Sequence, residues 1–292
     1  MFTDLHIHTL HSDGKLGVKE TIDIAHARNI KTLSITDHDS IAGVGEAIGY
    51  SKSLGISCIS GIELSCRNEL SCVAFPQDVS IHILAYNIDY NHEELFNTLN
   101  QYHAIRKQIL RELLQHLIKN DLDINYEDIY IVAGNQMRIQ DVVNHINSCF
   151  MSHDKKEQCI AIAEGYYPKL FFQDYSLQRA LQLIKNAGGL SVLAHPFFSY
   201  RDYDIEQNSF QNVSNLLDCL CDMGLDGIEA FYPTFTIGQS NFLYEEARNR
   251  DLFLTAGSDF HGTALRKTMM DFKIEQIAET VSLLNDVNRY SQ

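Results

Sequence analysis

Histidine and carboxylate side chains recur along this sequence at positions that suit the binding of divalent metal ions. The first pair is His6 and His8, which are separated by one residue. Residues two apart in a β-strand point to the same face, so both imidazoles can reach one ion. Similar side chains follow several later apolar segments. The candidate metal ligands are His6, His8, Asp13, His38, Glu63, His82, His195, Asp259 and His261.

Short apolar segments next to these residues are the strands that must position them. Amphipathic segments, for example 18–28 and 239–250, alternate with these strands, which predicts an α/β fold with a parallel sheet or barrel. The carboxyl ends of parallel barrel strands meet at one rim, so the candidate ligands are expected to converge there. Six imidazoles and three carboxylates exceed the needs of one ion, which predicts two or three ions. The expected strands are 5–8, 32–36, 57–64, 80–86, 190–194, 227–231 and 252–257.

One long segment, 91–173, interrupts this alternation. Apolar residues at helical spacing between 93 and 119, and again between 140 and 150, predict helices there. We expect an inserted helical subdomain at 91–173 that serves as a substrate lid, and a barrel formed by residues 1–90 and 174–292. The alternative is a few extra helices within one compact domain.

The composition excludes some partners and says little about others. Lys and Arg total 23 against 38 Asp and Glu, which gives a net charge of −15 and argues against binding to duplex DNA. No window resembles a membrane span, and the first residues lack the basic and apolar regions of a signal peptide. Seven cysteines without a CxxC pair indicate a reducing compartment, so we expect a cytoplasmic protein. The oligomeric state is not predicted.

Taken together, these segments resemble the polymerase and histidinol phosphatase (PHP) family of metal-dependent phosphoesterases. Gly188-Gly189 and the segment from Gly224 to Glu229 are most similar to a bacterial branch of nucleoside 3′,5′-bisphosphate phosphatases and RNA 5′-exonucleases. The resemblance implies a distorted (β/α)₇ TIM-like barrel with the helical insertion. The motifs that carry the resemblance are His6-x-His8, His11-Ser12-Asp13-Gly14, Thr36-Asp37-His38, Gly61-Ile62-Glu63, His82-Ile83-Leu84-Ala85-Tyr86, Ala194-His195-Pro196 and Ser258-Asp259-Phe260-His261.

The resemblance also implies how the ligands are grouped and which ions they take. Mn, Fe or Zn suit this histidine-rich set, and Mg suits it less well. His195 or His261 is expected to assist the leaving group as a proton donor. One ion is expected to take His6, His8, Glu63 and Asp259; a second, Glu63, His82 and His195; a third, Asp13, His38 and His261.

The activity implied is hydrolysis of a phosphomonoester by a hydroxide that the metal ions activate. A small nucleotide such as a nucleoside 3′,5′-bisphosphate is the expected substrate, with Arg138 and Arg201 binding its phosphate. Three residues depart from the branch pattern, namely Ile139, Gln140 and Phe235. The alternatives are a 5′-to-3′ exonuclease on short RNA or DNA oligonucleotides, a histidinol phosphate phosphatase, and a non-catalytic structural module that binds metal.

Overall fold

The chain folds into two compact units that are formed by different parts of the sequence. The computed structural model describes residues 2–70, 80–120, 139–197 and 206–262, together with positions 282 and 284. The first unit comprises Met1–Phe96 and Tyr175–Gln292, and the second comprises Asn97–Asp174. The role of the helical segment as a substrate lid stays a prediction.

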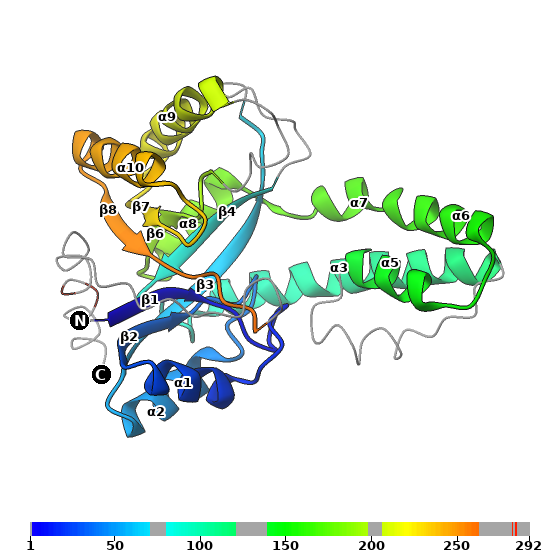
Figure 1. Cartoon of the computed structure of the whole chain (residues 1–292), viewed down its shortest axis with the longest axis horizontal. Coiled ribbons are helices and arrows are strands. Elements are labelled where there is room, and N and C mark those ends of the chain that lie inside the picture. Colours follow the sequence, from blue (N-terminus) through cyan, green and yellow to red (C-terminus); the bar gives the residue numbers. More distant parts are fainter. Residues whose placement is uncertain are drawn as a thin grey trace. The chain divides into compact units, whose positions relative to one another are not determined.

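Strands and helices alternate through the first unit, whereas the second unit is helical (Figure 1). The described strands are β1 Phe2–Ile7, β2 Ile30–Ile35, β3 Ser57–Arg67, β4 Ser80–Tyr86, β5 Tyr175–Ser176, β6 Leu190–Leu193, β7 Gly227–Phe231 and β8 Phe253–Ala256. The described helices are α1 Val18–Ala27, α2 Val44–Ser53, α3 Glu93–Lys119, α5 Ile139–Ser148, α6 His153–Glu164, α7 Tyr167–Phe171, α8 Leu177–Asn186, α9 Glu206–Asp222 and α10 Ile237–Arg250.

One mixed sheet of largely parallel strands forms the centre of the first unit. The strand order is β1-β2-β3-β4-β6-β7-β8, and the short strand β5 pairs with β3. Strand β4 is antiparallel to both β3 and β6, so the expectation of a wholly parallel sheet is wrong at this strand. Only twelve residues separate β3 from β4, which is the lower limit for a parallel crossover and its usual helix, whereas an antiparallel connection needs no crossover.

The sheet curls strongly, so that strands far apart in its order share an apolar core. Leu5 of β1 belongs to the same buried cluster as Ile59 of β3, Tyr86 of β4 and Val192 of β6. The Tyr86 hydroxyl donates a hydrogen bond to the Leu5 carbonyl oxygen at 2.9 Å. Beyond β8, Phe260 forms a single parallel bridge with Ile7. Among the described strands no ladder joins β8 to β1, so closure into a (β/α)₇ barrel stays a prediction.

Helices α1 and α2 cover the β1–β2 side of the sheet. Ile22 of α1 and Ala47 of α2 pack with Ile7 and Leu33 in a second buried cluster. Helix α1 begins after Gly17, whose backbone N–H donates to the Glu20 side chain at 2.9 Å and so satisfies one of the unpaired donors of the first turn. This packing includes Ile7, the last residue of β1, so it positions a strand end that carries candidate ligands.

The second unit has its own apolar core. Leu113 and Leu117 of α3 pack with Val142 and Ile146 of α5 and with Cys159 of α6. Their spacing along each helix is the helical periodicity that the sequence shows.

Two further observations concern membrane-spanning helices and cysteine pairing. In the part of the chain that the structure describes, no helix is long and apolar enough to cross a membrane. Cys219 forms a disulfide bond, which differs from the expectation of reduced thiols, because pairing depends on neighbours that only the fold brings together. The described free thiols are Cys58, Cys66, Cys149, Cys159 and Cys221.

Candidate metal centre

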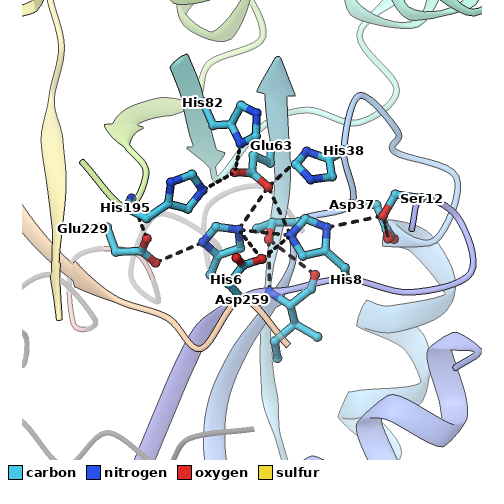
Figure 2. A network of polar contacts seen from close by, with 12 residues as sticks. His6, His8, Ser12, Asp37, His38, Glu63, His82, His195, Glu229 and Asp259 are labelled. Atoms are coloured by element: carbon cyan, nitrogen blue, oxygen red, sulfur yellow. Dashed lines mark hydrogen bonds and ion pairs between the residues drawn. The ribbon is translucent and has the colours of Figure 1, made fainter. Parts of the chain in front are cut away.

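The Glu63 carboxylate lies at the centre of the candidate site and is fully buried in the carboxyl-terminal half of β3. Its Oε2 atom lies 3.1 Å from Nε2 of His6, 3.1 Å from Nε2 of His8 and 3.2 Å from Nδ1 of His38 (Figure 2). These imidazoles come from the ends of β1 and β2. The convergence at one end of the parallel strands is the one that the sequence predicts.

The second oxygen of Glu63 faces two other histidines. Its Oε1 atom lies 2.9 Å from Nδ1 of His82 and 3.1 Å from Nε2 of His195. His82 lies near the start of β4, opposite Ser65 of β3, and reaches this end of the sheet only because β4 runs antiparallel. His195 follows β6 and has a φ of 26°, a backbone conformation that non-glycine residues rarely adopt and that occurs often at functional sites.

The remaining candidate ligands lie beside His8. Oδ1 of Asp259 is 3.1 Å from Nε2 of His8, and Oδ1 of Asp13 is 3.7 Å from its Nδ1. Nε2 of His261 lies 3.0 Å from Oδ1 of Asp13, while its Nδ1 donates to the Asp259 carbonyl oxygen at 2.7 Å. All nine candidate ligands therefore meet in one place, and we call them the histidine–carboxylate cluster.

Within the histidine–carboxylate cluster, three sets of side chains have ligand atoms close enough to hold an ion. In each set these atoms lie within 4.8 Å of one another, and imidazole with carboxylate is a donor mixture that suits Mn, Fe or Zn. The sets share members, which fits a centre of more than one ion. The assignment of individual ligands stays a prediction. The sets are His6, His8, Glu63 and Asp259; His8, Asp13, His38 and His261; and His38, Glu63 and His82.

The sets agree with the predicted grouping in outline and differ in detail. The first set is the one predicted. The observed set that contains Asp13 also includes His8, which was not predicted there. The observed set that contains Glu63 and His82 includes His38 in the place predicted for His195. His195 contacts Oε1 of Glu63 directly, so it remains next to the same carboxylate.

Charge within the histidine–carboxylate cluster strongly shifts the pKa values of its members. Burial alone raises the pKa of Glu63, but His38, His6 and His82 outweigh it and hold that pKa well below its usual range. Burial alone lowers the pKa of His8, but the hydrogen bonds that its imidazole donates to the carboxylates of Asp259 and Glu63 raise it to about 10. Burial lowers the pKa of His38 to about 3. Nearby imidazoles also lower the pKa values of Asp13 and Asp259, so all three carboxylates are ionised, as metal ligands must be.

A buried aspartate organises the loop that presents His8. Asp37 accepts hydrogen bonds from the Thr9 backbone N–H at 2.6 Å, the Thr9 hydroxyl at 2.7 Å and the Ser12 hydroxyl at 2.6 Å. Ser12 Oγ lies 3.3 Å from Nδ1 of His8. Because the Ser12 proton goes to Asp37, its oxygen is left to accept from His8 Nδ1–H, which turns Nε2 toward Glu63.

A second buried network holds Asp259. The Tyr232 hydroxyl donates to Asp259 Oδ2 at 2.8 Å, which leaves Oδ1 for the imidazoles. Asp4 accepts from both the backbone N–H and the hydroxyl of Ser258, and burial raises the pKa of Asp4 to about 7. The sequence analysis did not assign a role to Asp4, Tyr232 or Glu229. Asp4 and Tyr232 lie close in the chain to candidate ligands or motif residues, and Glu229 is the last residue of the Gly224–Glu229 segment.

The roles predicted for the substrate-binding residues and the proton donors are not tested by the geometry of the histidine–carboxylate cluster. Arg138 and Arg201 lie outside the described residues, so their role stays a prediction. His195 and His261 each direct Nε2 toward a carboxylate of the histidine–carboxylate cluster. Their role as proton donors is likewise a prediction.

Comparisons with known proteins relate the whole chain to a family of enzymes. A family model for the PHP domain matches residues 4–195. A 5′-3′ exoribonuclease of Haemophilus influenzae is 27% identical over 259 residues, which cover 88% of this chain and 89% of that protein. A phosphoribosyl 1,2-cyclic phosphate 1,2-diphosphodiesterase of Eggerthella lenta is 25% identical over 296 residues, which cover 94% of this chain and 99% of that protein. A 3′,5′-nucleoside bisphosphate phosphatase of Chromobacterium violaceum is 26% identical over 261 residues, which cover 88% of this chain and 86% of that protein.

A solved structure shares the fold. A crystal structure from Bifidobacterium adolescentis that carries the name metal-dependent phosphoesterase superposes with a TM-score of 0.70 at 21% identity and covers 98% of this chain and 96% of that one. The family model spans most of the chain, including six of the nine residues in the histidine–carboxylate cluster at positions 6 to 82, and ends at a seventh, His195. The chain belongs to the PHP domain family of phosphoesterases.

Proposed function

We propose that the chain hydrolyses the phosphomonoester of a small nucleotide such as a nucleoside 3′,5′-bisphosphate, with two or three divalent ions held by the histidine–carboxylate cluster. The observation that carries this proposal is the position of Glu63. Its two oxygens face different imidazoles, so one carboxylate belongs to more than one set of ligands. Shared carboxylates of this kind are suited to ions held close together for in-line displacement at phosphorus.

The residues of the chain have distinct tasks in this reaction. Divalent ions, when bound, neutralise phosphate oxygens and lower the pKa of a water molecule toward neutrality. Glu63 and Asp259 offset the positive charge of those ions. The side chains of His38 and His82 are 19% and 23% exposed, whereas Glu63 is fully buried. The substrate phosphate therefore approaches from the side of His38 and His82.

The choice of substrate rests on charge and on the relatives. A net charge of −15 with only 23 Lys and Arg favours a small substrate over a long polyanion, which needs an electropositive channel. The Chromobacterium violaceum relative supports the bisphosphate. The Haemophilus influenzae relative supports the second candidate, a 5′-to-3′ exonuclease on short RNA.

The test follows the hydrolysis products formed in Mn²⁺ and after chelation from four compounds: adenosine 3′,5′-bisphosphate, AMP, a 5′-phosphorylated oligonucleotide and a phosphoribosyl 1,2-cyclic phosphate. Chelator-sensitive release from the bisphosphate alone supports the proposal. Mononucleotides liberated from the oligomer support the exonuclease, and opening of the cyclic phosphate supports a diesterase like the Eggerthella lenta relative. Metal-loaded protein without activity on any of the four would contradict phosphoester hydrolysis of these classes.

A pair of variants ties the activity to the site. His8→Ala removes an imidazole that faces both Glu63 and Asp259 and should lower turnover more than about 100-fold, since even residues that only support metal ligands cost 10- to 100-fold. His153→Ala is the matched control, because its imidazole is 81% exposed on α6 and contacts only Glu157 among the ion pairs described. Equal activity of the two variants would refute the assignment of the site.

A further inference from the structure

Glu229 is a buried carboxylate that touches the histidine–carboxylate cluster without belonging to any of its ligand sets. It lies in the middle of β7 and is fully buried. Its Oε1 atom is 3.1 Å from Nδ1 of His6, and its Oε2 atom accepts a hydrogen bond from the His195 backbone N–H at 2.8 Å (Figure 2). Burying a charged carboxylate is costly unless strong hydrogen bonds satisfy it, so these two contacts explain how the charge is tolerated.

The contact with His6 selects which ring nitrogen faces Glu63. A carboxylate only accepts hydrogen bonds, so Nδ1 of His6 must carry the proton in this contact. The opposite nitrogen, Nε2, lies 3.1 Å from Oε2 of Glu63. With an ion bound, the neutral ring then presents its Nε2 lone pair, because metal-binding histidines donate their other N–H to such a partner.

The contact with His195 acts on the backbone rather than on the ring. His195 has a φ of 26°, which costs free energy for a residue with a Cβ atom. The hydrogen bond from its N–H to Oε2 of Glu229 helps to hold this conformation. Its ring nitrogen Nε2 then lies 3.1 Å from Oε1 of Glu63. The Glu229 carboxylate therefore restrains both His6, which faces Oε2 of Glu63, and His195, which faces Oε1.

We propose that Glu229 is a positioning residue that fixes His6 and His195 together, and so sets the metal affinity of both sides of Glu63. This inference rests on the metal centre of the proposed function and extends it to a residue outside the ligand sets. The fold keeps space for Glu229 at Gly257, where a Cβ atom would lie 2.5 Å from Oε1 of Glu229 and 2.9 Å from the His6 backbone nitrogen.

The test uses Glu229→Gln, which keeps the shape of the side chain and removes one acceptor. A glutamine amide has one accepting oxygen, so it can satisfy His6 or His195 but not both. We expect Mn²⁺ binding, followed by electron paramagnetic resonance, to weaken about 10- to 100-fold. Glu245→Gln is the matched control, because Glu245 is exposed on α10, and its Mn²⁺ affinity should equal that of the unmodified chain.

A spectroscopic measurement on the unmodified, Zn²⁺-loaded protein separates this role from a general effect on folding. Imidazole ¹⁵N resonances should show Nδ1 of His6 protonated and Nε2 without a proton. A His6 ring with the opposite arrangement would overturn the proposal even if Glu229→Gln failed to fold. Unchanged Mn²⁺ affinity in a folded Glu229→Gln variant would overturn it as well.

The outcomes distinguish this inference from the proposed function. Metal binding that depends on Glu229, without hydrolysis of any tested compound, would leave the positioning role standing and refute the activity. If the unmodified chain is active and binds Mn²⁺ as tightly as the Glu229→Gln variant does, only the role of Glu229 is refuted. An unmodified chain that binds neither Mn²⁺ nor Zn²⁺ would refute both.

Discussion

Replacing Gly257 with alanine should destabilise the protein and loosen its metal centre through a single added methyl group. Gly257 follows β8, and its φ lies outside the left-handed region, so alanine can adopt its backbone conformation. The effect is therefore steric. The new Cβ atom would meet the His6 Cβ atom and would lie 2.9 Å from the His6 backbone nitrogen and 2.5 Å from Oε1 of Glu229.

The nature of these neighbours sets the magnitude. The Cβ and backbone nitrogen of His6 belong to β1, which is paired with β2 and cannot move as a side-chain rotamer can. Overpacking of a core by added methyl groups costs about 1–3 kcal/mol, and we expect Gly257→Ala to lie near 3 kcal/mol. Relief of the contact must displace His6 or Glu229, so Mn²⁺ affinity should fall as well.

A second glycine provides a control of opposite sign. Gly49 lies inside α2, and a Cβ atom added there would meet nothing within 4 Å. Because glycine is unfavourable in a helix, Gly49→Ala should stabilise the chain by about 0.5–1 kcal/mol. Urea unfolding followed by circular dichroism, with a chelator present, measures both free energies. Gly257→Ala with unchanged unfolding free energy and unchanged Mn²⁺ affinity would refute this reasoning.

Two further predictions concern His8 and its surroundings. Ser12→Ala removes the oxygen 3.3 Å from Nδ1 of His8 and should weaken Mn²⁺ binding about 10-fold, whereas exposed Ser53→Ala should leave it unchanged. Metal uptake near pH 7.5 should release protons, because the pKa of His8 is raised to about 10 and that of His6 lies well above its usual value in the metal-free chain. Metal affinity should therefore rise as the pH increases toward 10. Because the released protons are taken up by the buffer, the measured enthalpy of metal binding should differ between buffers with different heats of ionisation. Identical enthalpies in such buffers would contradict this prediction.

The candidate ligands could be predicted from the sequence because their signal is local. Each residue follows or lies in a short apolar segment, and the alternation of strands and helices indicates that such segments end at one edge of a sheet. His6 and His8 share a strand, so their common face follows from the pleat alone. The PHP domain family followed from these motifs, and the family model confirms it.

His82 is a candidate ligand that the family resemblance predicts but that strand position alone does not place. In a wholly parallel sheet a residue near the start of a strand lies at the opposite edge from the carboxyl ends. The antiparallel direction of β4 brings it to 2.9 Å from Glu63. Strand direction depends on how a connection crosses the sheet, which the residues of β4 do not encode.

The residues that hold the ligands in place were decided by tertiary structure. Glu229 contacts His6, which is 223 positions away in the chain, and Asp4 contacts Ser258, which is 254 positions away. No sequence pattern links such pairs, since their proximity arises only when the sheet curls and β1, β7 and β8 come together. The sequence by itself therefore determined the ligand types, the strand ends that carry them and the family. The fold alone decided their orientation, their charge states and the roles of Glu229 and Gly257, because those depend on contacts between strands distant in sequence.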